Sequence, residues 1–136
     1  MIKKVFCVDD DPITLMLCKK VIEKVEFAQE IDVAQNGEEA LLYFDNLIEV
    51  YKSNTNTVYP ELIFLDLNMP IMNGWEFLDS YFKKKYNEIF INSKFIVLSS
   101  TIDPSDVEKS KNYPMVIGFL SKPITKEILE SLKNKI

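Results

Sequence analysis

The chain has 136 residues, which is the size of one domain, and a net charge of −5 from 16 basic and 21 acidic residues. This charge argues against a nucleic-acid binder, because such a protein needs a basic face for the phosphate backbone. No run approaches the roughly 20 apolar residues of a membrane span, and no secretory signal precedes the first apolar run. We therefore expect a single cytoplasmic domain over residues 1–136, without nucleic-acid or membrane partners.

The chain contains no histidine. This excludes Ser/His and Cys/His catalysis, histidine–zinc sites and a role as a carrier of phosphohistidine. Cys7 lies in an apolar run and Cys18 in an amphipathic one. Such cysteines are typical of buried, reduced thiols in a cytosolic protein, and a disulfide between them is the less favoured alternative.

Five short apolar runs alternate with longer amphipathic segments along the chain. The runs have the length and composition of buried strands; they are Val5–Val8, Ile31–Ala34, Leu62–Leu65, Phe95–Leu98 and Val116–Leu120. After each run a helix begins, where Asp or Thr caps the free amides or an Asn-Gly pair turns the chain. The five helix starts are Asp11-Pro12, Asn36-Gly37, Asn73-Gly74, Asp103-Pro104 and Thr125.

This alternation predicts an α/β fold with a five-stranded parallel sheet covered by helices on both faces. Right-handed crossovers place the C-terminal end of every strand on one edge, where ligands bind. In the first helix, we expect Ile13, Leu17 and Val21, with Met16 beside them, to face the core. The fourth helix is poor in apolar residues, so we expect it to pack loosely.

Polar side chains follow four of the strands at that edge. Asp9 and Asp10 follow the first strand, Asp66 the third, Ser99 the fourth and Lys122 the fifth. Three adjacent carboxylates repel one another unless a cation neutralises them, and two carboxylates, a backbone carbonyl and water suit Mg²⁺. One carboxylate can then attack phosphorus. Lys122 and Ser99 would hold phosphoryl oxygens through a positive charge and a hydroxyl hydrogen bond.

Each of these residues also has an ordinary explanation when it is taken alone. An Asp pair after a strand is often a solvated turn, a Ser-Ser-Thr run is more often a loop than a phosphate site, and a lone lysine usually lies on the surface. Asp11 is assigned to such an ordinary role, as the cap of the first helix. The joint placement of the other residues at one edge is what favours a site.

Five segments carry a family resemblance and follow one another over nearly the whole chain. They are Val8-Asp9-Asp10, Leu65-Asp66-Leu67-Asn68-Met69-Pro70, Asn73-Gly74, Val97-Leu98-Ser99-Ser100 and Gly118-Phe119-Leu120-Ser121-Lys122-Pro123. The Asp-x-x-Met-Pro motif with a following Asn-Gly is specific, and its combination with Lys-Pro is hard to reach by chance. The chain resembles the receiver domains of two-component response regulators. The resemblance implies a flavodoxin-like sheet with strand order 2-1-3-4-5.

The resemblance gives a role to each residue of the predicted site. Asp66 matches the phospho-acceptor. Asp10 matches the direct Mg²⁺ ligand, and Asp9 matches an acidic residue that acts largely through water. The backbone carbonyl of Asn68 would be a further metal ligand, and Lys122 matches the lysine that binds the phosphoryl group.

Further residues match the switch of the family. Ser99 matches the hydroxyl that moves toward the phosphoryl group, and Phe119 the aromatic residue that turns into the space left behind. Asn68 and Thr101 occupy positions that tune the lifetime of the phosphoryl group. These movements would change the face formed by the fourth helix, the fifth strand and the fifth helix, which a downstream protein partner would read.

The implied function is phosphorelay signal transduction. A histidine kinase or phosphotransfer protein would present phosphohistidine, and Asp66 would accept its phosphoryl group with Mg²⁺ bound. The chain would catalyse only its own phosphorylation and dephosphorylation, so we do not expect an enzyme. Only one helix follows Lys122, so we expect output by protein contact or relay.

Two other functions fit parts of the pattern. A pseudo-receiver would be an interaction module that is never phosphorylated, but every required site residue is present. A haloacid-dehalogenase-type phosphatase would use Asp9 as its nucleophile, because Asp9-Asp10-Asp11 contains Asp-x-Asp after a strand. The phosphatase is disfavoured because no acidic pair follows Lys122 on a further strand. It also leaves the Asp66–Pro70 motif unexplained.

Overall fold

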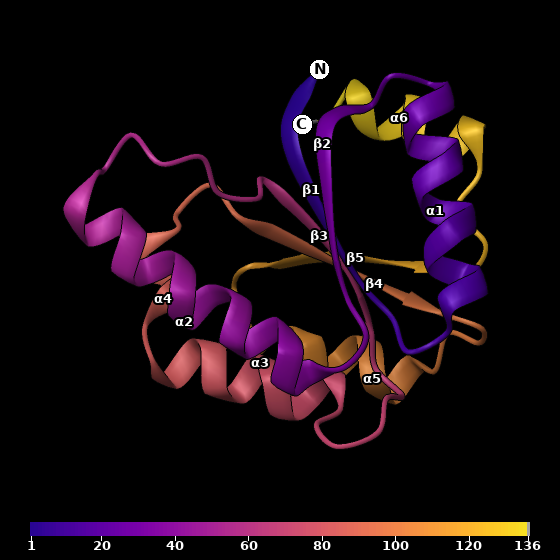
Figure 1. Cartoon of the computed structure of the whole chain (residues 1–136). Helices are drawn as coiled ribbons and strands as arrows, with labels where there is room; N and C mark the ends of the chain where they lie inside the picture. Colours follow the sequence, from indigo (N-terminus) through magenta and orange to yellow (C-terminus); the bar gives the residue numbers. More distant parts are fainter. Residues whose placement is uncertain (136) are drawn as a thin grey trace.

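One sheet of five parallel strands forms the centre of the molecule in the computed structural model, which describes residues 1–135 (Figure 1). The strand order is β2-β1-β3-β4-β5. The α/β class and the order implied by the family resemblance are both confirmed. The strands are β1 (Ile2–Val8), β2 (Ala28–Ala34), β3 (Leu62–Asp66), β4 (Lys94–Ser99) and β5 (Val116–Ser121).

Strands β1 and β2 begin earlier than their apolar runs. Their first residues are more polar, and Lys4 of β1 pairs with Glu30 and Asp32 of β2 at 3.4 and 3.2 Å. These contacts lie at the side of the sheet where β2 is the outermost strand. Hydropathy alone therefore located the apolar part of each of these strands and missed their more polar first residues.

Helices cover both faces of the sheet. In Figure 1, α1 and α6 lie on one face, and α2, α3 and α5 lie on the other. The helices are α1 (Pro12–Lys24), α2 (Gly37–Ser53), α3 (Gly74–Lys83), α4 (Tyr86–Ile89), α5 (Pro104–Ser110) and α6 (Lys126–Lys133). The five expected helices are present, and α4 is an additional short helix that the sequence did not predict. Lys85 immediately precedes α4. Its φ of 60° lies in the left-handed region, so the chain turns there between α3 and α4.

The two faces have chemically different cores. The core under α2 and α3 is aromatic, with Phe44, Phe77, Tyr81 and Phe95 all fully buried. All six tyrosines of the chain and its single tryptophan, Trp75, belong to this layer or pack against it. The core under α1 and α6 is mainly aliphatic and contains both cysteines. We call these the aromatic layer and the aliphatic layer.

The expected inner stripe of α1 is largely wrong, although Val21 is half-buried and packs against the aliphatic layer. Leu15, Cys18 and Ile22 are the buried residues of this helix, whereas Ile13 is 63% exposed and Leu17 46% exposed. Both sets of residues repeat at helical spacing, so the periodicity cannot choose between them. The choice depends on how the loop after β1 sets the rotation of the helix.

Both cysteines are buried and carry free thiols, as expected. Burial also raises the pKa of the Cys18 thiol to about 11, which keeps it protonated at neutral pH. Cys7 and Cys18 do not form a disulfide with each other in this structure.

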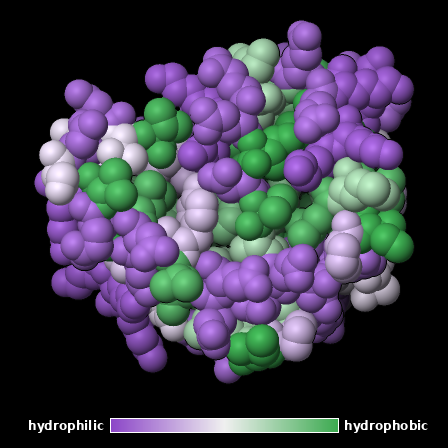
Figure 2. Space-filling model, in the orientation of Figure 1, coloured by the Kyte–Doolittle hydropathy of each residue, from purple (hydrophilic) through white to green (hydrophobic). Residues whose placement is uncertain are grey.

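Polar residues cover most of the face seen in Figure 2, and apolar residues gather in a hollow near its centre. A groove between α1 and the outermost strand is lined by Met16 and Val33 among others. These two side chains are 46% and 44% exposed. No helix within residues 1–135 is long and apolar enough to cross a membrane.

Candidate functional site

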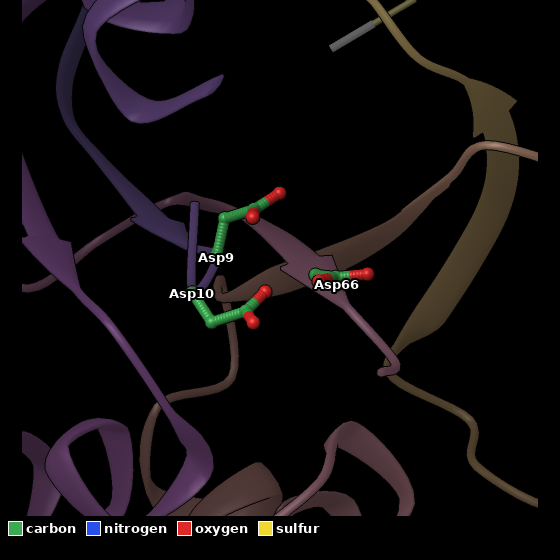
Figure 3. A group of neighbouring side chains, drawn as sticks. All are labelled: Asp9, Asp10 and Asp66. Atoms are coloured by element: carbon green, nitrogen blue, oxygen red, sulfur yellow. The ribbon is translucent and has the colours of Figure 1, made fainter. Parts of the chain in front are cut away.

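Three aspartates converge at the C-terminal edge of the sheet (Figure 3). Asp9 and Asp10 directly follow β1, and Asp66 is the last residue of the neighbouring strand β3. One carboxylate oxygen of each lies within 4.8 Å of the others. Asp9 and Asp66 are only 4% and 6% exposed, whereas Asp10 is exposed. The structure thus brings together the carboxylates that the strand order predicted to meet.

Lys122 supplies the positive charge of this cluster. It directly follows β5, and its backbone N–H donates a hydrogen bond to the carbonyl of Ser99 at the end of β4 (2.9 Å). Its Nζ lies 2.6 Å from Asp9 Oδ2 and 3.5 Å from Asp66 Oδ1. The Lys122–Pro123 peptide bond is cis. The lysine therefore reaches across the end of β4 to contact carboxylates on two other strands.

Burial and neighbouring charges shift the pKa values of this cluster. Burial raises the pKa of Asp66 to about 6, and the charge of Asp9 acts in the same direction. The ammonium of Lys122 and the N–H of Asn68, 3.4 Å from Asp66 Oδ1, oppose this rise. Burial acts to lower the pKa of Lys122, but its contacts with Asp9 and Asp66 outweigh burial and raise it. Asp66 is therefore a carboxylate whose charge is poorly stabilised beside a charged lysine.

The cluster offers the donors that a hard divalent cation prefers. Its candidate ligand atoms are all oxygens, which suits Mg²⁺ better than a soft metal. Asp9 Oδ1 accepts the N–H of Asp11 at 3.0 Å. Asp9 Oδ2 is buried and accepts no hydrogen bond in the described part of the chain, although the Lys122 ammonium lies close to it. Asn68, whose carbonyl is a predicted further ligand, is exposed two residues beyond Asp66.

The loop after Asp66 is held by a close contact that the sequence did not predict. The N–H of Gly74 donates a hydrogen bond to the carbonyl of Leu67 at 2.9 Å. A Cβ atom at Gly74 would lie 2.6 Å from the backbone oxygen of Asp66 and 2.9 Å from the Cα of Leu67. The Asn73-Gly74 pair was interpreted only as a helix start, which it is, since Asn73 and Glu76 form a capping box. The glycine also lets the start of α3 approach the loop that follows Asp66.

The predicted switch residues lie on the adjacent strands β4 and β5. Ser99 is half-buried, and its hydroxyl donates a hydrogen bond to the carbonyl of Thr101 at 2.5 Å. Phe119 is half-buried on β5, opposite Val97 of β4. Thr101 is exposed in the loop after β4. In this structure the Ser99 hydroxyl is therefore bonded within its own loop and not to Asp66.

Comparison with known proteins gives a consistent result for both sequence and fold. Residues 5–133 match the model of the response regulator receiver domain. The chain is 26% identical over 134 residues to a protein-glutamate methylesterase/protein-glutamine glutaminase of Methanococcoides burtonii, covering 98% of this chain and 33% of that protein. The chain spans less than half the length of this relative and of the other curated relatives that it matches.

Two solved structures illustrate the similarity of fold. A two-component response regulator from Cytophaga hutchinsonii is 30% identical, with a TM-score of 0.78 over 98% of this chain and 96% of that chain. A CheX-CheY-BeF3-Mg²⁺ complex from Borrelia burgdorferi has a TM-score of 0.72 at 23% identity, over 98% of this chain and 88% of that one. Because the family model covers nearly all of its residues, the chain belongs to the response regulator receiver domains of two-component signalling.

Proposed function

We propose that Asp66 accepts a phosphoryl group from a histidine kinase or phosphotransfer protein, and that the domain then displays this group to a protein partner. The observation that supports this proposal is the placement of Asp66 beside Asp9, Asp10 and Lys122 at one edge of the sheet. A nucleophilic carboxylate, two further carboxylates and an ammonium are the groups that phosphoryl transfer needs.

The contacts of Asp66 favour one of its oxygens as the nucleophile. Oδ1 accepts the N–H of Asn68 and faces Lys122. We therefore assign the attack to Oδ2. Its lone pair forms a bond to the phosphorus of phosphohistidine, the phosphorus–nitrogen bond breaks, and its electron pair leaves with the imidazole. The product is an acyl phosphate on Asp66 and a neutral histidine on the donor, whose leaving imidazole takes up one proton from solvent.

The other residues of the cluster would supply or hold the positive charges that offset the negative charge of the phosphoryl group. Asp9, Asp10, Asp66 and the carbonyl of Asn68 would hold Mg²⁺, as the all-oxygen donor set suggests. When bound, the ion would offset the negative charge of the phosphoryl oxygens. Lys122 now pairs with Asp9 at 2.6 Å, and it would exchange this contact for a phosphoryl oxygen.

We infer that the switch begins at Ser99. Its hydroxyl would leave the Thr101 carbonyl and donate to a phosphoryl oxygen, and Phe119 would turn into the space left behind. Ser99 and Phe119 lie on adjacent strands, so the change would alter the face formed by α5, β5 and α6. A downstream protein would bind this face, and Asn68 and Thr101 would set how long the phosphoryl group persists.

Intact-mass measurement with Mg²⁺ and acetyl phosphate tests the proposal. We expect the protein to gain one phosphoryl group, Asp66→Asn to lose the gain and Asp9→Asn to weaken it. Asp103→Asn is the matched control, because Asp103 is an exposed helix cap that contacts Ser105. Loss in Asp9→Asn with full gain in Asp66→Asn would instead indicate the phosphatase. No gain with any donor or kinase would indicate the interaction module.

The structure already disfavours the phosphatase in one respect. That reaction needs Asp11 to point at the same site as Asp9. Asp11 is exposed and caps α1, because its carboxylate accepts the N–H of Ile13 at 2.9 Å and the hydroxyl of Thr14 at 3.1 Å. Its carboxylate is therefore engaged by the helix.

A further inference from the structure

A small cavity lies beside the acceptor cluster, within the aliphatic layer. It has a volume of about 180 Å³ and is bounded by α1, the end of β4 and the segment that joins β5 to α6. Its lining residues are Thr14, Leu17, Cys18, Leu98, Lys122, Pro123 and Ile124. Leu98, Ile124 and Cys18 are 3–5% exposed and form the floor, whereas Leu17 is 46% exposed and stands at the mouth. The cavity is thus open to solvent and buried at its base.

The wall of the cavity is chemically apolar. The Thr14 hydroxyl donates its hydrogen bond to Asp11, and the Lys122 ammonium pairs with Asp9. The Thr14 hydroxyl and the Lys122 ammonium therefore already have partners outside the cavity. The remaining polar group is the Cys18 thiol, which behaves as a small hydrophobe. A ligand in this cavity would meet carbon and sulfur and would find few hydrogen-bond partners.

The size of the cavity limits the ligand. An apolar protein cavity of about 150 Å³ lined by aliphatic and aromatic side chains is large enough to bind benzene. The cavity here is open at Leu17 and is lined by aliphatic carbon and one thiol, and its volume of about 180 Å³ leaves room for one ring with a small substituent. Water at the buried base of the cavity gains little, because the side chains of Leu98, Ile124 and Cys18 offer few of the two to four polar partners that a buried water needs.

We propose that this cavity is a binding site for a compact, neutral, single-ring apolar molecule. Such a ligand would contact the aliphatic stem of Lys122, whose ammonium reaches Asp9 and Asp66. Binding would restrict the movement of this side chain. The site therefore offers a route by which a small apolar molecule changes the rate of chemistry at Asp66; this second part rests on the proposed function.

Titration with toluene tests the binding. We expect saturable shifts of the methyl NMR signals of Leu98 and Ile124. Cys18→Leu fills the floor, and Leu17→Phe narrows the mouth without touching the buried core; both should lose the saturable shifts. Met16→Phe is the matched control, because Met16 neighbours Leu17, is also 46% exposed and lines the groove with Val33 instead. It should bind as the unaltered protein does.

NMR shifts that never saturate with toluene, or saturable shifts that persist in both Cys18→Leu and Leu17→Phe, would overturn the proposed site. The effect on Asp66 is measured separately, as the rate of mass gain from acetyl phosphate with and without toluene. Toluene should change this rate in the unaltered protein and in Met16→Phe, but not in Leu17→Phe. An unchanged rate despite saturable binding would refute the coupling. Absence of mass gain in every protein would refute the proposed function and leave the binding result standing.

Discussion

At the scale of single residues, Asp66 shows how a site can conflict with stability. The carboxylate is 6% exposed, and its pKa is raised to about 6 by burial and by the charge of Asp9. A carboxyl pKa in the unfolded chain is about 3.9. The folded state therefore binds more protons than the unfolded state between about pH 4 and 6, and stability is lost as the pH rises through this window.

We predict that Asp66→Asn makes the metal-free protein more stable at pH 7. The gain should be about 3 kcal/mol at most, because each pKa unit corresponds to about 1.4 kcal/mol. Urea unfolding of both proteins at pH 7 and pH 4 measures it. The difference should shrink at pH 4, where Asp66 is almost fully protonated in the folded state and about half protonated in the unfolded chain, so that little of the charge penalty remains. Equal stability of the two proteins at pH 7 would show that the buried charge is not costly.

Gly74 gives a second prediction, which concerns the backbone. Gly74→Ala would place a Cβ 2.6 Å from the backbone carbonyl oxygen of Asp66, so either the loop that follows Asp66 or α3 must shift. We expect a loss of about 1–3 kcal/mol in unfolding free energy, as for other overpacked sites, together with slower phosphorylation of Asp66. Gly118→Ala is the control, because no atom lies within 4 Å of a Cβ built there. Equal stability of the two variants in urea unfolding would contradict the close contact.

At the scale of elements, α5 is held to the molecule by few contacts. Ser110 is its one residue that is fully buried. Lys109 Nζ lies 4.5 Å from the centre of the Trp75 ring on α3. Just beyond α5, Tyr113 lies 5.8 Å from the same ring and donates a hydrogen bond to Asp79 of α3. The loose packing expected from the sequence agrees with this small buried surface, and α3 supplies the anchor.

We predict that Lys109→Ala loosens α5 without unfolding the domain. A cation–π contact at an exposed site contributes about 0.5–1 kcal/mol, which is enough to raise local opening several-fold. Hydrogen exchange of the α5 amides should become faster, and the fluorescence of Trp75 should change. Lys111→Ala is the matched control, since Lys111 pairs with Glu108 of the same helix. Faster exchange in both variants would point to the loss of a cation near the C-terminal end of the helix, and not to the contact with Trp75.

The junction between α3 and α4 has its own link to α2. Asp45 of α2 accepts hydrogen bonds from Lys84 Nζ (2.8 Å) and the Tyr86 hydroxyl (2.5 Å). Burial acts to raise the pKa of Asp45, but these two partners outweigh it and lower the pKa. A lowered carboxyl pKa stabilises the fold at neutral pH, and this contribution is lost as the pH falls through the acid range.

We predict that Asp45→Asn lowers the unfolding free energy at pH 7 by about 1 kcal/mol, because the site is partly open to solvent. The difference from the unaltered protein should begin to shrink as the pH falls below the ordinary carboxyl pKa of about 4, and it should be lost once the pH is below the lowered pKa of Asp45 in the folded state. Glu49→Gln serves as the comparison, because Glu49 pairs with Lys52 of the same exposed helix face. A difference that stays constant down to pH 3 would rule out a charge effect.

At the scale of the whole molecule, most of the fold followed from local chemistry. Each expected strand and each expected helix start is present, because apolar runs, caps and Asn-Gly pairs act within a few residues. The meeting of Asp9, Asp66 and Lys122 was also predictable, because right-handed crossovers in a parallel sheet bring the C-terminal ends of its strands to one edge. Their chemical roles remain predictions until phosphorylation is measured.

The features that the sequence did not predict depend on contacts between distant parts of the chain. The buried side of α1 depends on its rotation over the sheet, and two stripes of similar hydropathy compete there. The short helix α4 depends on the packing of Tyr86 and Phe90 in the aromatic layer. The close approach of Gly74 to Asp66 depends on where α3 starts relative to β3. No local pattern contains this information.

The separation of the two layers gives the molecule two independent optical and chemical labels. Every tyrosine and the tryptophan report on the aromatic layer, so fluorescence and near-ultraviolet circular dichroism observe that half. Cys7 and Cys18, the only cysteines of the chain, lie in the aliphatic layer, so the rate at which a thiol reagent labels them observes the other half. Running both measurements along one denaturant series shows whether the halves unfold together, and the natural sequence requires no introduced label for it.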